Sequence, residues 1–463
     1  MNFYIYPDQS HTYSYLKNYH FENNPTPPPD FLFPAFNPIF LASCSATRKT
    51  QQRINTTLET SPVFKKGFAG LAIYNPLKGD FLYAHNEEKY FTPASNTKLF
   101  TFYTGLKILG DSVPALRYTI KADSLIFTGT GDPSFLNPEL PDSNVLSFLK
   151  NSGKELFYLP PVYTEKHLGP GWAWDDYDAY YSAERTDFPL YGNLVNFKFK
   201  KGDTIPQVFP EIFKDSLSIQ KSFAEKNDNI SRAIENNTFY FQNFPRIEED
   251  EQDIPLKFSS ELLAAVLTDT LQQKVQILKE RPEQFQLNKK LYSIPTDSIY
   301  KRMLEVSDNF IAEQILLMAS NEIADTLKSK IAIDYMKENY LQDLPDEPMW
   351  HDGSGLSRYN LFTPRTMVKL LEKILAEVPQ EKLFSMMATG GKSGTLENYY
   401  KAEEPYIFAK TGTLRNNHSL SGYLKTNSGK ILIFSFMNSN YTVPTSQLKQ
   451  EMEHILRFIR DNY

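Results

Sequence analysis

Hydrophobic residues near the start of the chain form two short runs followed by a helical repeat. Residues 67–74 and 81–84 are mainly apolar, and the turn-forming sequence Asn-Pro-Leu-Lys-Gly separates them. Further on, apolar side chains recur every three or four positions, at Leu99, Phe102, Leu106 and Leu109. That spacing is typical of a helix. The pattern predicts two strands that return on each other, followed by a helix that begins near residue 95.

The middle of the chain has a different pattern. Residues 118–121 and 125–128 are expected to be short strands, and residues 195–213 mix short apolar runs with turn residues, which favours a β-rich region. Residues 225–253 are polar, charged and rich in Asn, and we expect a solvated loop there. A helix is predicted from residue 262 to about 273. Near the C-terminal end, the apolar pattern again predicts strands, at residues 406–409, 419–424 and 431–437.

The predicted helix near residue 95 begins with chemistry-bearing residues. Ser95 and Lys98 form an S-x-x-K pattern, which places both side chains on one face of a helix, one turn apart. Five other serines have the same spacing to a lysine: Ser14, Ser147, Ser218, Ser298 and Ser446. The pattern alone is therefore weak, and a capping serine beside a solvated lysine is the plain alternative. A helix start favours Ser95, because its free N–H groups can bind a developing oxyanion.

Two segments fit a K-[TS]-G-T pattern. Lys410-Thr411-Gly412-Thr413 follows the predicted strand at 406–409, so it would lie on a strand that borders a cleft. Glycine there would let a ligand backbone approach closely. Lys392 follows two glycines and precedes a polar run, so we expect it in a loop. We therefore prefer Lys410, against the alternative of an exposed lysine on an edge strand.

Ser307-Asp308-Asn309 lies between two segments that both look helical. Taken alone, it is best explained as a capping turn between helices. Its position between the other two motifs favours a functional role instead. The order S-x-x-K, S-D-N, K-T-G is that of penicillin-interacting serine enzymes, which acylate a serine.

Composition narrows the function further. The chain has 463 residues, room for two or three domains, and a formal net charge of −6, which gives no basic footprint for nucleic acid. Its seven histidines are scattered and no Cys/His cluster suggests a metal. The glycine-containing segments at 129–134 and 391–393 do not complete a dinucleotide-binding or phosphate-binding loop. We therefore expect neither a metal nor a cofactor.

The single cysteine, Cys44, follows a short apolar run at residues 31–41. Leu-Ala-Ser-Cys resembles the lipobox of bacterial lipoproteins, whose cysteine becomes the lipidated N-terminus. The apolar run contains prolines and lacks the basic flank that a signal peptide usually has. Two interpretations stay open: lipidation of Cys44, or a free thiol in a flexible leader.

Beyond the three motifs, the chain resembles the class C low-molecular-mass penicillin-binding proteins, the D-Ala-D-Ala carboxypeptidase/endopeptidase family. The resemblance extends from about residue 60 to the C-terminus. It includes Thr130-Gly-Asp-Pro, Gly171-Trp-Ala-Trp-Asp-Asp, Asp352-Gly-Ser-Gly-Leu-Ser-Arg and Ser419-Leu-Ser-Gly-Tyr. Their order and length make the resemblance specific.

The resemblance implies an α+β fold of the β-lactamase/transpeptidase type, in which helices flank an antiparallel sheet. A helical subdomain would supply Ser307 and Asn309, and a C-terminal helix near 446–459 would pack on the sheet. The implied organisation is a leader at 1–44, a catalytic domain at 55–115 and 286–463, and a largely β inserted region at 116–285. The insertion looks shorter than in well-known members.

The resemblance and the residue types together imply a mechanism. Ser95 would attack the penultimate D-Ala carbonyl after Lys98, neutralised by burial and the charge of Lys410, removes its proton. Backbone N–H groups of Ser95 and Thr413 would stabilise the oxyanion. Ser307 would relay a proton to the leaving D-Ala. Asn309 would hold Lys98 and the substrate amide, and the side chains of Lys410, Thr411 and Thr413 would bind the terminal carboxylate.

The expected partners are peptidoglycan stem peptides and β-lactam antibiotics, with membrane anchoring if Cys44 is lipidated. The expected location is the periplasm or the cell envelope. Two other functions remain open from the sequence. One is a related serine hydrolase, a β-lactamase or esterase, which rapid β-lactam turnover would favour. The other is a non-catalytic wall-binding or sensor protein, which peptidoglycan binding without D-Ala release would favour.

Overall fold

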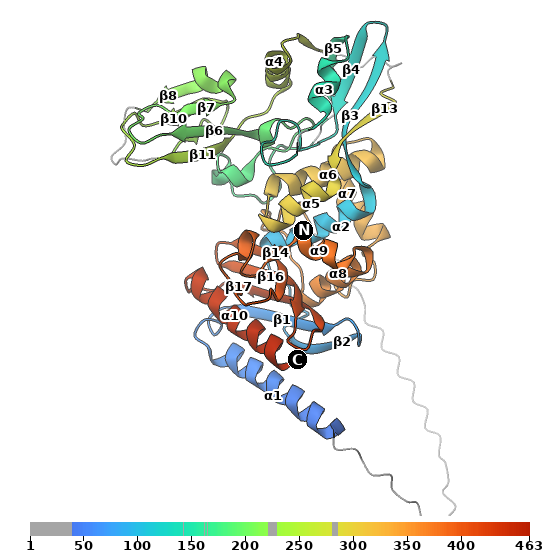
Figure 1. Cartoon of the computed structure of the whole chain (residues 1–463), viewed down its shortest axis with the longest axis vertical. Coiled ribbons are helices and arrows are strands. Elements are labelled where there is room, and N and C mark those ends of the chain that lie inside the picture. Colours follow the sequence, from blue (N-terminus) through green and yellow to red (C-terminus); the bar gives the residue numbers. More distant parts are fainter. Residues whose placement is uncertain (1–38, 142, 162, 164, 221–228, 280–285) are drawn as a thin grey trace, which may run out of the picture. The chain divides into compact units, whose positions relative to one another are not determined.

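Figure 1 shows a computed structural model of the whole chain, in which residues 39–141, 143–161, 163, 165–220, 229–279 and 286–463 are described. The chain forms two units, residues 1–44 and 45–463. Most of the predicted leader lies outside the described residues. Its last residues form the start of helix α1 (Ile39–Thr60), and the side chain of Cys44 is not described. The lipidation of Cys44 therefore stays a prediction.

The largest sheet is antiparallel, with the strand order β14-β15-β16-β17-β1-β2. Its strands are β1 (Phe68–Asn75), β2 (Asp80–His85), β14 (Ala388–Thr389), β15 (Ile407–Leu414), β16 (Asn417–Lys425) and β17 (Ile431–Ser439). The predicted strands at both ends of the chain are present and lie side by side, because β1 pairs along its length with β17.

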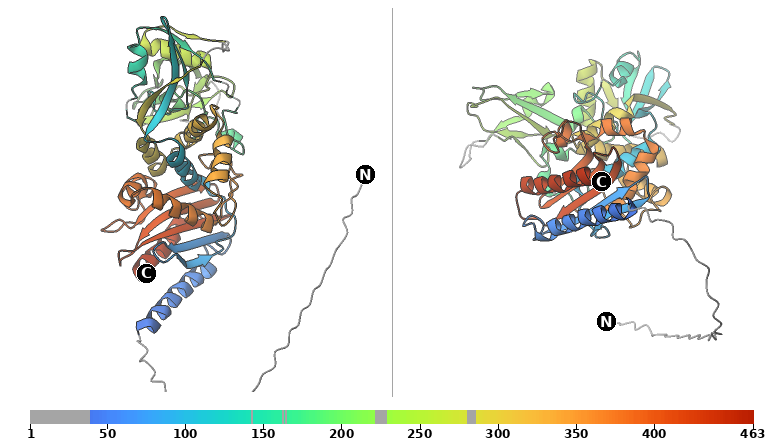
Figure 2. Two further views of the ribbon diagram at one scale, coloured as in Figure 1. Left: turned by 90° about the vertical axis from the view of Figure 1, so that its right-hand side faces the viewer. Right: turned by 60° about the horizontal axis from the view of Figure 1, so that its bottom comes forward.

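Both faces of this sheet are covered, which explains why its strands are apolar without a clean alternation. Leu71 and Ile73 of β1 pack in one core with α1 and the C-terminal helix α10 (Thr445–Asn462), whereas Ala72 packs in a second core with the group of helices described next. Figure 2 shows α1 and α10 next to each other on one face of the sheet. The sheet is thus the middle layer of a three-layer domain.

A group of helices covers the other face. It comprises η1 (Ala94–Thr97), α2 (Lys98–Ile108), α5 (Thr296–Glu305), α6 (Asn309–Ala324), α7 (Ser329–Asn339), α8 (Pro364–Glu377) and α9 (Gln380–Met386). Residues 310–321 of α6 are all buried, so this helix is the core of the group. A helix that is mainly apolar on all sides belongs in such a position, and its buried polar residues Glu313, Gln314 and Ser320 have hydrogen-bond partners. The predicted helical subdomain is therefore present, with Asn309 at the first position of its central helix.

The inserted region contains a five-stranded sheet in the order β12-β5-β4-β3-β13. The strands are β3 (Ser112–Lys121), β4 (Ser124–Gly129), β5 (Glu155–Tyr158), β12 (Val275–Ile277) and β13 (Lys289–Pro295), and helices α3 (Val145–Lys150) and α4 (Ser260–Leu271) pack with it in one core. Because β13 pairs with β3, the chain leaves and re-enters the helical group through neighbouring strands. This sheet runs from residue 112 to residue 295.

Two three-stranded sheets complete the insertion. They are formed by β6 (Leu194–Phe199), β7 (Gln207–Phe209), β8 (Leu217–Ile219), β9 (Ser231–Arg232), β10 (Phe239–Phe241) and β11 (Asp250–Pro255), with the short helices η4 (Tyr191–Asn193) and η5 (Glu211–Ser216) beside them. The prediction of a solvated loop at 225–253 was wrong, because this stretch supplies β9, β10 and the first residues of β11. Phe239 and Phe241 bury their rings among Val195, Phe197 and Phe199, which is enough to form a small core.

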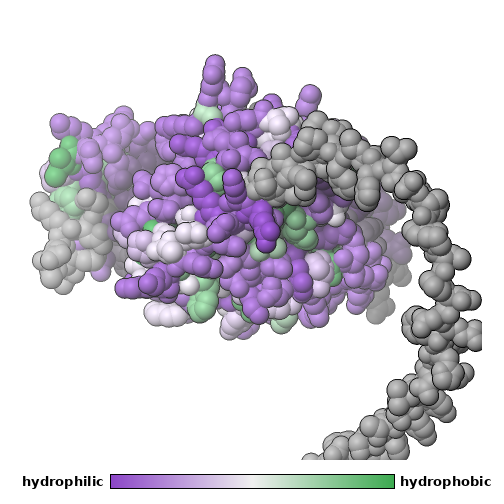
Figure 3. Space-filling view, turned by 90° about the horizontal axis from the view of Figure 1, so that it is seen from below, coloured by the Kyte–Doolittle hydropathy of each residue, from purple (hydrophilic) through white to green (hydrophobic). Residues whose placement is uncertain are grey.

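The apolar residues are largely inside the fold. The face drawn in Figure 3 is mainly hydrophilic, with only scattered hydrophobic residues. Among the described helices, none combines the length and the apolar character needed to cross a bilayer.

Candidate active site

Ser95 lies in η1, which leads directly into α2. The turn is tight: Ala94 has a φ of +48°, and a β-carbon on Gly355 would lie only 1.9 Å from the Ala94 carbonyl oxygen. The side-chain amide of Asn96 donates a hydrogen bond of 2.9 Å to the backbone carbonyl of Lys410. Backbone packing on one side and strand β15 on the other therefore fix the position of Ser95.

Lys98 begins α2 and is fully buried. Its Nζ donates to Ser95 Oγ at 2.9 Å, to Asn309 Oδ1 at 2.6 Å and to the backbone carbonyl of Ser354 at 2.6 Å. Three acceptors from three parts of the chain thus direct one amine at one hydroxyl. The structure brings Ser95, Lys98 and Asn309 together as the sequence predicts.

Burial lowers the pKa of Lys98 to about 8, while Asp352, Asp308 and Glu313 act in the opposite direction. Burial also lowers the pKa of Lys410 well below its ordinary value, and the charge of Lys98 lowers it further. Of the two causes that the sequence suggests for Lys98, burial alone accounts for the lowered pKa, and the charge of Lys410 does not contribute. A lysine amine in this state is neutral in a useful fraction of molecules near neutral pH, as a general base requires.

The Ser-Asp-Asn turn joins α5 to α6. The carboxylate of Asp308 caps α6 by accepting a hydrogen bond of 3.0 Å from the Ile311 N–H. Asn309 donates from Nδ2 to the carbonyl of Tyr181 at 2.9 Å while its Oδ1 accepts from Lys98. Ser307 has a φ of +70°, and its hydroxyl makes no hydrogen bond with another described residue. The turn is therefore both the capping turn and a contact of the lysine, and Ser307 bonds to neither lysine in this structure.

Strand β15 carries the K-T-G-T motif. Lys410 is fully buried and its Nζ donates to the carbonyl of Thr411 at 2.9 Å. The Thr411 hydroxyl donates to the hydroxyl of Thr395 at 2.8 Å, and the Thr413 hydroxyl lies 2.8 Å from Nδ1 of His418. Thr395 belongs to the competing K-S-G-T segment, so that segment supports Thr411 although its lysine is exposed in a loop.

The structure gives Gly412 a packing role besides the predicted one, the close approach of a ligand backbone. A β-carbon at this position would lie 2.4 Å from the carbonyl oxygen of Pro93 and 2.9 Å from the backbone nitrogen of Ser95. The close neighbour of Gly412 is therefore the backbone of the serine turn. The glycine lets β15 lie directly against η1.

Asp352 was not identified from the sequence as a site residue. Its carboxylate is buried and accepts hydrogen bonds from Trp172 Nε1 at 2.9 Å, from the backbone N–H groups of Gly355 at 2.9 Å and Ser357 at 2.6 Å, and from Asn360 Nδ2 at 2.7 Å. These bonds shape the loop that presents the Ser354 carbonyl to Lys98. The Asp-Gly-Ser-Gly-Leu-Ser segment was recognised as part of the family resemblance, and that was the signal available.

Two further buried groups, Glu313 and His418, were also missed. Glu313 lies one turn after Asn309 on α6, and His418 lies opposite Thr413 on β16. Burial lowers the pKa of His418 to about 3, so its ring is neutral in the folded protein. The helical spacing from Asn309 could have indicated Glu313, whereas His418 shows only in the strand register.

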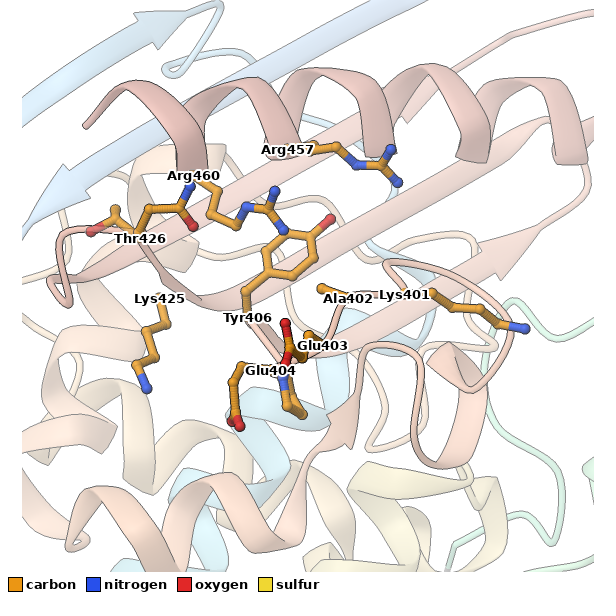
Figure 4. A pocket seen from close by; sticks show the side chains of 11 residues that line it. Lys401, Ala402, Glu403, Glu404, Tyr406, Lys425, Thr426, Arg457 and Arg460 are labelled. Carbon is orange, nitrogen blue, oxygen red and sulfur yellow. The ribbon is translucent and has the colours of Figure 1, made fainter.

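A pocket of about 560 Å³ lies elsewhere, and none of the predicted site residues lines it. In Figure 4 Arg460 extends from α10 over the ring of Tyr406, Arg457 extends from the same helix to one side, and Lys425 also lines the pocket. Both guanidinium groups already have carboxylate partners, Glu453 and Asp461. The chemistry described above is therefore separate from this pocket.

The site places a serine hydroxyl and two buried amines along one strand and one helix start. A nucleophile within hydrogen-bonding distance of its base, with the base oriented by a third group, is the arrangement of covalent catalysis. Here Asn309 and the Ser354 carbonyl orient Lys98. The arrangement can acylate Ser95.

Known proteins resemble this chain in sequence and in fold. The model of the D-Ala-D-Ala carboxypeptidase 3 (S13) family matches residues 50–461. The D-alanyl-D-alanine carboxypeptidase DacB of Haemophilus influenzae is 23% identical, over 92% of this chain and 96% of that protein. The D-alanyl-D-alanine carboxypeptidase of Actinomadura sp. is 24% identical, over 89% of this chain and 85% of that protein.

Among solved structures, penicillin-binding protein 4 of Haemophilus influenzae matches with a TM-score of 0.69 at 21% identity, covering 89% of this chain and 98% of that one. A structure of the same protein complexed with a β-lactam matches with a TM-score of 0.64 at 19% identity, over 89% of this chain and 98% of that one. These matches show that the fold is shared.

Proposed function

The chain belongs to the D-Ala-D-Ala carboxypeptidase 3 (S13) family and is a serine-type D-Ala-D-Ala carboxypeptidase, and we propose that its acyl-enzyme forms on Ser95. The observation that carries this proposal is the hydrogen bond from the buried Lys98 amine to the Ser95 hydroxyl. Its substrates are peptidoglycan stem peptides that end in D-Ala-D-Ala, and β-lactams acylate the same serine.

Acylation starts with proton transfer from Ser95 Oγ to the neutral amine of Lys98. The oxygen then attacks the carbonyl carbon of the penultimate D-Ala, and the carbonyl becomes an oxyanion. The backbone N–H groups of Ser95 and Thr413 receive it, each donor being worth about 3 kcal/mol in such sites. The close contact of Gly412 with the serine turn supports this pairing.

Collapse of the tetrahedral intermediate breaks the peptide bond. The leaving nitrogen takes a proton, so that D-Ala departs as a free amino acid, and Ser307 passes on that proton from Lys98. The terminal carboxylate binds to Thr411 and Thr413, assisted by Lys410. Water then attacks the ester, the acyl group leaves as the shortened peptide, and Ser95 regains its proton.

Intact-mass analysis tests this assignment. Incubation with benzylpenicillin is expected to add one penicilloyl group to the wild-type chain and none to Ser95→Ala. The second readout is release of D-Ala from a purified pentapeptide, measured for both proteins. An adduct that persists in Ser95→Ala would overturn the assignment of the nucleophile.

We also propose that the protein works in the periplasm or cell envelope, because its substrate is the wall, and that Cys44 anchors it there as a lipidated N-terminus. Two or more acyl chains give stable membrane attachment. Detergent partitioning of the protein from its native host, followed by mass analysis of its N-terminus, tests this. A product that stays in the aqueous phase and retains residues before Cys44 would contradict the lipidation.

A further inference from the structure

Glu313 and Lys98 hold the same residue from two sides. The carboxylate of Glu313 accepts a hydrogen bond of 2.7 Å at Oε1 from the backbone N–H of Ser354. The carbonyl of Ser354 accepts the bond of 2.6 Å from the Lys98 amine. Both charged side chains have no exposed surface. A movement of the Glu313 carboxylate would therefore move the carbonyl that directs the amine at Ser95.

The second oxygen of Glu313 faces the inserted region. Arg185 Nη1 lies 3.5 Å from Glu313 Oε2, and this guanidinium is itself buried, with 1% of its side chain exposed. It also contacts Glu165 Oε1 at 3.2 Å and Ser329 Oγ at 3.0 Å, and it donates to the carbonyl of Lys166 at 2.8 Å. A buried cation that binds several partners in fixed directions is well suited to hold a carboxylate in place.

Asp352 holds the loop that contains Ser354 through hydrogen bonds of its own. All of its strong bonds go to the loop itself or to Trp172, as described above, which fixes its position. Burial and the charge of Asp352 raise the pKa of Glu313 to about 7, while the guanidinium of Arg185 acts against this. The charged groups around Glu313 are thus Arg185 from the insertion, Asp352 from the loop and Lys98 from α2, with Glu165 behind Arg185.

We propose that Glu313 is a positioning residue for the general base: its carboxylate, held by Arg185, fixes the Ser354 carbonyl that aims the Lys98 amine, and its negative charge favours the protonated form of that amine. Glu313 touches neither Ser95 nor the space where the acyl group forms. Its role is to couple the inserted region to the base through one buried carboxylate. This inference rests on the proposed function, in which Lys98 takes the proton of Ser95.

Three variants separate the negative charge of Glu313 from its hydrogen bond to the Ser354 N–H. Glu313→Gln keeps the size and an acceptor for the Ser354 N–H but removes the charge. Glu313→Asp keeps the charge but is one methylene shorter, so it weakens the hydrogen bond to the Ser354 N–H. Glu322→Gln is the matched control on the same helix, because its carboxylate pairs with Lys290 at a partly exposed position. Circular dichroism melting is measured for each protein, so that only folded variants are compared.

The measurement is the rate of acylation by a fluorescent penicillin between pH 6 and 10, using the full chain. In Glu313→Gln the midpoint of the rising limb is expected to move down by about 0.5–1 pH unit, since a carboxylate that favours protonated Lys98 is gone. Between pH 7, above which Glu313 is mostly ionised, and the midpoint, this variant should then acylate about 3-fold faster than wild type, after scaling to the plateau, and the difference should shrink towards pH 6 as Glu313 itself becomes protonated. Glu313→Asp should keep the wild-type midpoint but lose about 10-fold at the plateau.

A purely structural role for Glu313 would change melting temperatures and plateau rates but leave the midpoint of Glu313→Gln at the wild-type value. That result in a folded variant would overturn the proposal, as would an equal shift in Glu322→Gln. If Glu313→Gln does not fold, a shifted midpoint in Glu313→Asp would contradict the proposal in its place. A wild-type enzyme acylated on Ser95 without any rising limb would refute the base role of Lys98, and this outcome is distinct from an unshifted variant.

Discussion

Replacing Lys98 by arginine tests whether this residue is a base or only a positive charge. Arginine keeps the charge but does not lose its proton in proteins. Burial lowers the pKa of Lys98 from 10.5 to about 8. At pH 7 roughly 10% of the amines are then neutral, against about 0.03% at the ordinary pKa, so the shift supplies a roughly 300-fold larger population of base. Burial of Lys98 therefore raises the fraction of neutral amine at pH 7 by more than two orders of magnitude.

The sign of the pH dependence follows from the active form. The neutral amine is the base, so acylation of Ser95 should rise with pH, tenfold per unit well below pH 8, and level off above it. In Lys98→Arg the rate should fall by about 10²-fold or more at every pH tested, which is the usual scale of general base catalysis. Stopped-flow mixing with a fluorescent penicillin gives these rates directly.

Arginine is also larger than lysine, and a misfit could imitate the loss of a base. Lys98→Ala with added small primary amines controls for size, because a neutral amine that enters the vacated space should restore part of the rate. Rescue should grow with the concentration of the unprotonated amine. A wild-type rate in Lys98→Arg, or a flat profile from pH 6 to 9 in the wild type, would show that another group activates Ser95.

Two further variants probe strand β15 and its support. In Gly412→Ala the new methyl group would meet the backbone of Pro93 and Ser95, which cannot swing away as a side chain can, so acylation should fall by about 10²-fold; an unchanged acylation rate would contradict the close contact. In His418→Ala the Thr413 hydroxyl loses its partner, so KM for a D-Ala-D-Ala peptide should rise up to about 10-fold with little change in kcat. Because His418 is held neutral with its pKa lowered to about 3, the wild type should also lose stability as pH falls from 6.5 towards 3, and urea titrations of His418→Ala should lack this component.

Local spacing predicted the parts of the site that lie close together in the chain. The serine and the lysine of S-x-x-K are three residues apart at a helix start, and helical geometry alone puts Lys98 beside Ser95. The apolar runs likewise predicted the central strands, because each is buried on both faces. The prediction of a loop at 225–253 was wrong because the strands in this stretch carry no apolar run of that length. Strands of two or three residues, such as β9 and β10, are too short to show an alternating pattern.

The environment of Lys98 could not be predicted from local spacing. Its other two acceptors, Asn309 and Ser354, are 211 and 256 residues away in the chain. Motif order suggested the first, but nothing in the local sequence around Ser354 marks a backbone carbonyl as a partner of the amine. Burial, which sets the pKa of Lys98, is a property of the assembled fold and not of any segment.

This difference bears on how the insertion and the catalytic domain depend on each other. Asn309 donates to the carbonyl of Tyr181, Asp352 accepts from Trp172, and Glu313 faces Arg185. Each of these three contacts joins a residue next to Lys98 or Ser354 to a single stretch of the insertion, residues 172–185. The catalytic motifs alone would leave the buried carboxylates of Asp352 and Glu313 each without one of their partners, which is costly in a folded core. The insertion is therefore part of what keeps the base in place.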